Sequence, residues 1–248
     1  STYGSYDVFN INPSYLINKK VKLFANLSSG YRTPSLYQLY SEYGNKELKP
    51  EAAVTAEGGL QYFNSNNTIN VRGVYFSRYV KEVIYFYFNP ATFQSEYINQ
   101  DKQKDNGIEL EATYTGIKNT SIKAFYNYVD GNITTKNGSG KDTTYFNLIR
   151  RPKSFFGLTV NSNILKRWTV SGNISISGKR EDKYFNATTF TTVDTTLKSY
   201  ALLNIYSDYS FLNNKLKVFA DLRNITNTTY AEISGFNTLR FTIFCGVR

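Results

Sequence analysis

Few residues of this chain combine in a pattern that could perform chemistry, and the most suggestive segment is Gly138-Ser139-Gly140-Lys141. A phosphate-binding loop requires GxxxxGK followed by Ser or Thr, placed between a strand and a helix. Here Asp142 follows the lysine, and no helical pattern continues from it. The Gly, Ser and Lys content of the segment instead predicts an exposed, flexible loop rather than a nucleotide site.

Metal chemistry and nucleophilic chemistry are equally restricted. The chain has no histidine, and Cys245 is its single cysteine, which excludes Cys/His zinc sites, Ser-His-Asp triads and disulfides within the chain. Glu181, Asp182 and Asp142 could ligate calcium, but their spacing is not that of a known cation loop. Cys245 lies on the apolar face of the predicted last strand, with Phe241, Ile243 and Val247, and is expected to act as a small apolar side chain. We therefore predict no catalytic residue, no metal site and no cofactor.

Composition favours β-structure as the framework of the chain. Aromatic residues make up 17% of the 248 residues, yet the mean hydropathy is −0.42. Such values are expected where apolar and polar residues alternate along strands. No run approaches the roughly 18 to 20 apolar residues that a membrane-spanning helix needs. If the chain enters a bilayer, it must do so as a closed β-structure.

The net charge of +10 raises the question of anionic partners. Lys and Arg are scattered through the chain, and no run of five or six like charges and no nucleic-acid-binding motif is present. Nucleic acid is therefore not expected as a partner.

Strict alternation recurs along the chain. Val21, Leu23 and Ala25 share one face of a predicted strand, while the residues between them include Lys22 and Asn26 on the other face. The same alternation runs through 168–177 and through 216–223, where Phe219 is the one apolar exception. We expect the apolar faces to contact lipid and the polar faces to line a lumen. A soluble carbohydrate-binding β-sandwich would also alternate in this way.

Connection lengths separate these alternatives. Short turns alternate with long polar loops, which is typical of a transmembrane barrel. The short turns are predicted at Ile17 to Lys20, Asn64 to Asn67, Gly116 to Asn119, Ile164 to Arg167 and Leu212 to Lys215. The long loops are predicted at Thr33 to Pro50, Lys136 to Asp142, Lys179 to Thr192 and Ile225 to Gly235. The spacing predicts about eleven strands in an all-β, antiparallel transmembrane barrel.

Tyrosines placed on these strands are expected to form the aromatic girdles of a membrane barrel. Those that support this prediction are Tyr75, Tyr79, Tyr126, Tyr128, Tyr206 and Tyr209.

The most specific sequence feature is GYRTPSLYQLYSEYGNKELKPE, from Gly30 to Glu51. It combines an aromatic-Arg-x-Pro turn, a Leu-Tyr segment, Gly-Asn and Leu-x-Pro-Glu. The residues that carry the pattern are Tyr31, Arg32, Pro34, Leu36, Tyr37, Leu39, Tyr40, Gly44, Asn45, Leu48, Pro50 and Glu51. In this order and spacing they resemble a signature of TonB-dependent outer-membrane receptors.

Three further segments resemble elements of the same family. Asn106 to Glu111 is similar to its Gly-(Ile/Val)-Glu strand, and Arg150-Arg151-Pro152 is similar to its Arg-Arg-Pro strand. The segment from Asn224 to Tyr230 is similar to the element that precedes the terminal strand. The resemblance covers the chain from about Tyr31 to its end.

The resemblance implies that residues 1–248 form the C-terminal half of a barrel of about twenty-two strands. The implied partners are the remaining barrel half and a plug domain on the same or a separate chain, the TonB energy-coupling complex, outer-membrane lipid and a small-molecule substrate. The implied location is the outer membrane of a Gram-negative bacterium. If Arg150 or Arg151 faces the lumen, with Lys123, Glu109 and Glu111, these charges could hold the plug; a merely hydrated lumen is the alternative.

The implied function is energised uptake of a scarce nutrient. Cobalamin is favoured over ferric siderophores because the interval from Leu39 through Gly44 to Pro50 is short, whereas siderophore receptors often carry insertions there. The alternative function is a passive porin or channel. A barrel enzyme is disfavoured because the outer-membrane proteases and phospholipases of this size rely on a catalytic histidine.

Two structural expectations complete this interpretation. The strand from Phe236 to Arg248 should not pair with the strand near Tyr3 to Ile17, because an odd number of strands would force a parallel seam. The Thr33 to Pro50 segment should be an extracellular loop, with its prolines at strand margins.

Overall fold

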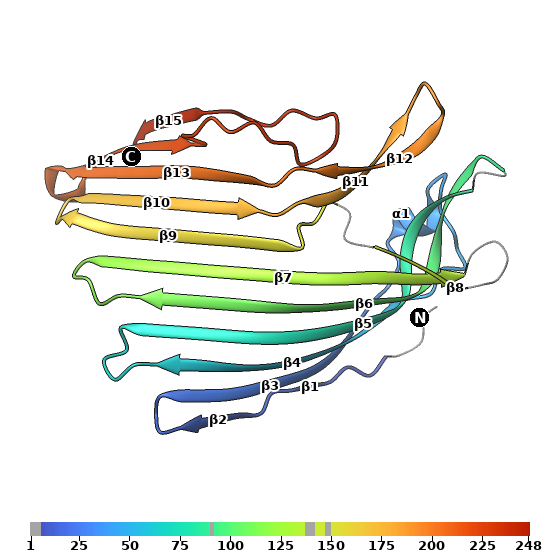
Figure 1. Cartoon of the computed structure of the whole chain (residues 1–248), viewed down its shortest axis with the longest axis horizontal. Coiled ribbons are helices and arrows are strands. Elements are labelled where there is room, and N and C mark those ends of the chain that lie inside the picture. Colours follow the sequence, from blue (N-terminus) through green and yellow to red (C-terminus); the bar gives the residue numbers. More distant parts are fainter. Residues whose placement is uncertain (1–5, 90–91, 137–141, 147–149) are drawn as a thin grey trace.

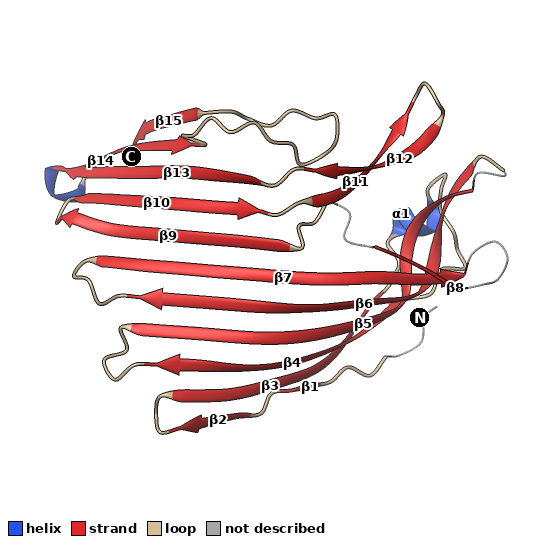
Figure 2. Cartoon of the chain, in the orientation of Figure 1, coloured by secondary structure: helices blue, strands red, loops and turns tan. Residues whose placement is uncertain are grey.

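A computed structural model describes residues 6–89, 92–136, 142–146 and 150–248, and shows one large curved antiparallel sheet (Figure 1). Nearly all of the ordered elements are strands (Figure 2). The sheet contains β1 (Asn10–Ile11), β2 (Ser14–Ile17), β3 (Val21–Arg32), β4 (Glu51–Phe63), β5 (Ile69–Asn89), β6 (Gln94–Tyr114), β7 (Thr120–Lys136), β8 (Asp142–Phe146), β9 (Ser154–Leu165), β10 (Trp168–Ser177), β13 (Tyr200–Phe211), β14 (Leu216–Arg223) and β15 (Thr242–Val247). The remaining elements are α1 (Leu36–Tyr40), the 3₁₀ turn η1 (Leu212–Asn214) and the hairpin of β11 (Arg180–Asn186) and β12 (Thr191–Leu197).

The strands occupy eleven positions across the sheet, as the sequence predicted. Both β1 and β2 pair with β3, so they are two segments of one interrupted strand. The interruption falls at Asn12-Pro13, where proline cannot donate a ladder hydrogen bond. Likewise β8 and β9 pair with successive parts of β7.

All five predicted short turns lie at one edge of the sheet, and the long connections lie at the opposite edge (Figure 1). Both of these edges run across the ends of the strands. We call the one with the short turns the short-turn edge (residues 18–20, 64–68, 115–119, 166–167 and 212–215) and the opposite one the long-loop edge. Several short turns use asparagine in the left-handed region, with φ of 54° at Asn67, 59° at Asn119 and 57° at Asn213. The predicted alternation of connection lengths is therefore confirmed.

Two details differ from the sequence expectation, and a third predicted segment lies largely outside the described residues. The Lys179 to Thr192 segment was predicted as a loop, but most of it belongs to the β11–β12 hairpin, which extends β10 and β13 beyond the main sheet. The terminal strand is shorter than Phe236 to Arg248, because β15 begins only at Thr242. The predicted loop at Lys136 to Asp142, with its Gly138-Ser139-Gly140-Lys141 segment, has its residues 137–141 outside the described residues.

The two faces of the sheet follow the predicted alternation. On the outer face, Leu23 pairs with Leu60 across β3 and β4, and 45% and 51% of their surfaces are exposed. On the inner face, Asn26 pairs with Glu57, and Arg72 pairs with Glu111. Cys245 lies beside Ala220 on the outer face and is exposed.

Five of the six predicted girdle tyrosines lie on the outer face, but Tyr206 does not. It pairs with Ser171 and Asp221 on the inner face and stacks at 6.2 Å on the Phe219 ring. The reason is parity: Tyr209 lies three residues further along β13, so the two tyrosines must point to opposite faces.

The first and last strands are not paired with each other within the described residues. β1 and β2 pair with β3, and β15 pairs with β14, so the sheet is a partial barrel. Among the described residues, no helix is long and apolar enough to cross a membrane.

Candidate functional site at the long-loop edge

The signature segment folds back on itself after β3 through a short helix. Ser35 caps α1, because its Oγ accepts a hydrogen bond from the Gln38 backbone at 3.2 Å. The Gln38 side chain in turn accepts from the Ser35 backbone at 2.9 Å. This reciprocal capping box was not anticipated from the sequence, although its S-x-x-Q pattern is a known start signal.

Gly44 allows the chain to return across the end of α1. A Cβ atom at this position would lie 2.7 Å from the backbone carbon of Leu39, a distance that real Cβ atoms do not adopt. The next residue, Asn45, donates its backbone N–H to the Gln38 carbonyl at 2.9 Å. This close approach explains why glycine occupies position 44. Leu39 and Leu48 are buried beneath the segment.

The segment is hydrogen-bonded to the distant strand β6. The Asn45 side chain donates to the Tyr97 carbonyl at 3.1 Å, and the Tyr97 backbone N–H donates to the Tyr43 carbonyl at 3.0 Å. Asn99 adds a second connection: its Oδ1 accepts from the Lys49 N–H at 2.8 Å, and its Nδ2 donates to the Lys49 carbonyl at 3.0 Å. Asn99 was not anticipated from the sequence, where nothing distinguishes it from other asparagines.

Arg32 and Glu51 close the base of the segment. They are cross-strand partners on β3 and β4, and the guanidinium binds the carboxylate through two hydrogen bonds of 2.8 and 2.7 Å. Glu51 also accepts from the Ile84 backbone at 2.7 Å, next to Glu82, whose φ is 54°. The pair therefore joins both ends of the 33–50 connection to the point where β5 departs from regular strand geometry.

An aromatic cluster fills the space between the segment and the β5–β6 hairpin. Tyr43 contacts Phe86 at 5.5 Å, and Phe86 contacts Tyr97 at 5.2 Å, both edge to face. Above this cluster α1 leaves apolar surface uncovered, with Tyr37 59% exposed and Tyr40 66% exposed. Pro34 and Pro50 are buried, whereas Leu36 is exposed on the helix.

A second group of contacts, the Asp182 cluster (Arg150, Arg180, Asp182, Tyr200, Tyr230 and Ser234), joins three connections of the long-loop edge. Asp182 is buried and accepts from Arg150 Nε at 2.6 Å and from the Ser234 backbone at 2.7 Å. Burial opposes ionisation, but the hydrogen bonds from Ser234, Arg150 and Lys183 outweigh it and lower the pKa of Asp182 below its ordinary value. Its carboxylate is thereby ionised at neutral pH.

The other half of this cluster surrounds Arg180. The guanidinium is buried, lies 4.8 Å over the Tyr200 ring, and donates to the Lys198 and Ala231 carbonyls. Tyr200 packs in turn on Tyr230, with ring centroids 4.3 Å apart. Arg180 and Asp182 lie on the same face of β11, so one hairpin face holds the connection between β14 and β15.

The Arg150-Arg151-Pro152 segment was predicted to lie on a strand, and this prediction was wrong. These residues lie in the connection before β9, where Arg150 has a φ of 62° and Pro152 cannot donate a ladder hydrogen bond. Neither arginine therefore faces the lumen from a strand. Of the charges expected beside them, Glu111 pairs with Arg72 on the inner face at 3.6 Å.

Asn224 has a structural role at the start of the last connection. Its side chain accepts from the Thr228 N–H at 2.8 Å and donates to the Thr228 carbonyl at 2.9 Å. A φ of 49° and nearly complete burial explain the preference for asparagine at this turn.

The described residues contain no group of three side chains suited to hold a metal ion. Asp182, a candidate calcium ligand, is instead committed to Arg150 and backbone N–H groups. Asp182 therefore connects the β11–β12 hairpin with two neighbouring connections, through Arg150 and Ser234.

Comparison with known proteins identifies the architecture. The chain is 25% identical over 240 residues to the "Vitamin B12 transporter BtuB" of Photobacterium profundum, an alignment that covers 95% of this chain and 36% of that protein. The chain thus spans about a third of the length of this relative.

Solved structures of receptors share the fold. The ferripyoverdine receptor of the outer membrane of Pseudomonas aeruginosa superposes with a TM-score of 0.73 at 18% identity, covering 96% of this chain and 32% of the receptor. The FrpB iron transporter of Neisseria meningitidis superposes with a TM-score of 0.75 at 15% identity, covering 97% of this chain and 38% of the transporter. A family model described as "TonB dependent receptor-like, beta-barrel" matches residues 2–225. The chain therefore belongs to the family of TonB-dependent receptor-like β-barrels.

Proposed function

We propose that this chain is the C-terminal part of the barrel of an outer-membrane transporter that takes up a scarce nutrient at the expense of energy delivered by TonB. The observation that carries the proposal is the match of the family model to residues 2–225. The folded signature segment supports it, because Arg32, Gly44, Asn45 and Glu51 all make contacts that fix the 33–50 connection. In this placement the long-loop edge faces the cell exterior.

We propose cobalamin as the substrate in preference to a ferric siderophore. Two observations support this choice: the relative named as a vitamin B12 transporter, and the short interval between α1 and Pro50. The exposed tyrosine rings of α1 offer aromatic surface suited to a large ring system, and Lys46 Nζ lies 5.5 Å from the centre of the Tyr40 ring.

We further propose that residues 1–248 function together with a plug domain and the remaining barrel strands. Among the described residues, β1/β2 and β15 each have one side without a strand partner, and this supports the proposal because unpaired N–H and C=O groups are costly in hydrocarbon. In this arrangement the signature residues Arg32, Pro34, Leu36, Tyr40, Gly44, Asn45, Leu48, Pro50, Glu51, Arg150, Arg151, Pro152, Asn224 and Tyr230 shape the exterior loops and do not perform chemistry.

The test is uptake in cells that lack their own cobalamin receptor. Expression of the full receptor should restore growth on trace cobalamin in a strain with functional TonB, and should not restore it in the same strain without TonB. Restored growth on a ferric siderophore but not on cobalamin would overturn the substrate assignment. Equal uptake with and without TonB would overturn energised transport and indicate a passive channel.

A further inference from the structure

The charges of the short-turn edge are all of one sign. The five turns and the chain end beside them carry seven of the 29 Lys and Arg residues and none of the 19 Asp and Glu residues. These cations are Lys19, Lys20, Lys118, Lys166, Arg167, Lys215 and Arg248. All seven residues are exposed, and none forms an ion pair with a described residue.

The inner wall of the sheet carries charges of both signs. Some of its cations pair with carboxylates, as in Arg72 with Glu111 at 3.6 Å and Lys217 with Asp208 at 3.1 Å. The short-turn edge differs because its turns contain Lys and Arg but no Asp or Glu.

A band of aromatic residues lies directly beside these cations. Each short turn has at least one exposed aromatic side chain on the outer face within a few residues. Those nearest the five turns include Tyr15, Tyr62, Tyr114, Trp168 and Tyr209. Aromatic rings on the outer face of a membrane barrel lie at the headgroup level. In the proposed membrane placement, the turn cations lie beside this band at the ends of the strands, within reach of lipid phosphates.

The turns also carry apolar side chains beside the cations. Ile117 precedes Lys118, and Leu165 precedes Lys166; these aliphatic residues are 50% and 59% exposed. Leu212, in the next turn, is 68% exposed. An exposed aliphatic group next to an unpaired cation suits a surface where acyl chains meet headgroups.

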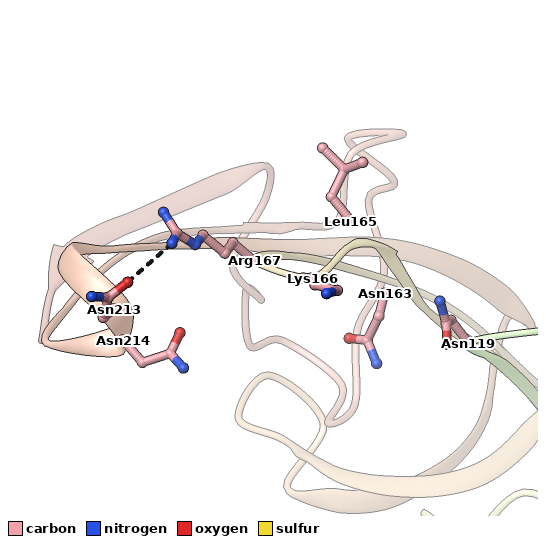
Figure 3. Close-up of a pocket in the computed structure, with 7 residues that line it drawn as sticks. All are labelled: Asn119, Asn163, Leu165, Lys166, Arg167, Asn213 and Asn214. Carbon is pink, nitrogen blue, oxygen red and sulfur yellow. Dashed lines mark hydrogen bonds between the residues drawn. The ribbon is translucent and has the colours of Figure 1, made fainter.

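A polar hollow opens between three of the turns. It has a volume of about 610 Å³ and is lined by Asn119, Asn163, Leu165, Lys166, Arg167, Asn213 and Asn214 (Figure 3). Arg167 donates to the Asn213 side chain at 3.1 Å, which holds the guanidinium between two turns. Leu165 points away from the other labelled side chains (Figure 3). The hollow thus presents cationic and amide donors without a carboxylate.

We propose that the short-turn edge binds the headgroups of anionic phospholipids in the periplasmic leaflet of the membrane. The inference rests on the proposed outer-membrane placement. Charge complementarity selects the occupant, since lipid phosphates are anionic and lie at the depth fixed by the aromatic band. Attraction of this kind depends on the number of cations near the surface and weakens with salt.

The test measures lipid selectivity of the full receptor in phosphatidylcholine bilayers by spin-label electron paramagnetic resonance. Spin-labelled phosphatidylglycerol should associate more strongly than spin-labelled phosphatidylcholine. The triple variant K118Q/K166Q/K215Q should reduce this preference by roughly fivefold at each affected site. The matched control K104Q/K179Q/K198Q removes three exposed cations away from the short-turn edge and should keep the preference.

The remaining outcomes separate the alternatives. Equal association of both lipids with a correctly inserted wild-type protein would overturn this inference and leave the proposed transport intact. Equal losses in the two triple variants would overturn it as well, because the effect would then follow net charge alone. Inorganic phosphate should weaken the preference no more than chloride at equal ionic strength; selective competition by phosphate would identify a free-anion site instead. Failure of the wild type to insert would contradict the outer-membrane placement itself.

Discussion

The side-chain amide of Asn99 forms two hydrogen bonds with the backbone of Lys49, one to its N–H and one to its carbonyl. The Asn99 side chain thus satisfies the backbone groups of Lys49 as a neighbouring strand would do. The same Nδ2 group also donates to the Glu82 carbonyl at 2.7 Å. Three backbone groups, two at the end of the 33–50 connection and one on β5, thus depend on one amide.

Replacing Asn99 with Ala should release the 33–50 connection from the β5–β6 hairpin. Each lost hydrogen bond contributes about 0.5–1.5 kcal/mol, so local opening should become roughly tenfold or more frequent. Limited proteolysis of intact cells would detect this as faster cleavage within residues 41–50. Asn127→Ala, an exposed position on β7, is the control. Unchanged cleavage in the Asn99 variant would show that the remaining hydrogen bonds to Tyr97 and the aromatic contacts are enough to hold the segment.

Gly44→Ala should disturb the return of the chain past α1. The added methyl group would meet the Leu39 backbone at 2.7 Å, and overpacking of this kind typically costs about 1–3 kcal/mol. We expect faster hydrogen exchange over residues 36–48 and weaker substrate binding. Gly58→Ala is the matched control, because a Cβ atom added there would have no neighbour within 4 Å. Equal behaviour of the two variants would contradict the close packing of Gly44.

The Asp182 cluster should make the packing of the β11–β12 hairpin on the connection between β14 and β15 depend on pH in the acidic range. The pKa of Asp182 is lower in the folded protein than its ordinary value of 3.8, so its contribution to stability is complete well above pH 3.8. That contribution is lost as the pH falls through the lower folded pKa. Spin labels at Thr188→Cys and Phe236→Cys, in a Cys245→Ser background, would report the separation of the β11–β12 hairpin from the last connection.

In this experiment the distance distribution should stay narrow near neutral pH and broaden only in strong acid. Asp182→Asn should broaden it at all pH values, since the pairing with Arg150 is then lost. Glu181→Gln, at the exposed neighbouring position, should leave the pH dependence unchanged. Broadening of the wild type already between pH 5 and 7 would contradict a lowered pKa.

The sequence predicted the sheet well because its signals are local. Period-2 alternation, as at Val21, Leu23 and Ala25, follows directly from strand geometry, and turn residues such as Asn119 show where strands end. The face to which each strand side chain points, and the order of short and long connections, could therefore be predicted without knowledge of tertiary contacts. Tyr206 is the exception: its aromatic ring suggested the outer face, whereas its odd separation from Tyr209 puts it on the inner face.

The site was less predictable because its contacts are not local. Glu51 meets Ile84, and Asp182 meets Ser234 fifty-two positions away, without any spacing rule that links them. Arg150 was assigned to a strand because its segment resembles the Arg-Arg-Pro strand of the family, whereas in the structure its backbone is left-handed and its side chain binds Asp182. The signature residues were found in advance from their resemblance to the family, and the capping box at Ser35 and Gln38 could have been found from its local pattern.

The two faces of β10 should tolerate charge very differently. Ile174 lies on the outer face, where it pairs with Leu203 and Leu158, whereas Ser175 lies on the inner face opposite Gly157. In the proposed membrane placement, Ile174→Lys puts an ammonium group into hydrocarbon near the middle of the strand, at a cost of about 2–4 kcal/mol. Ser175→Lys puts the same group into a hydrated lumen at little cost. The folded fraction in outer-membrane preparations, measured by the gel mobility of unheated samples, should therefore fall strongly for Ile174→Lys and stay near the wild-type value for Ser175→Lys. Similar losses in both variants would mean that the outer face is not in contact with lipid, and would favour a soluble sheet packed on other protein.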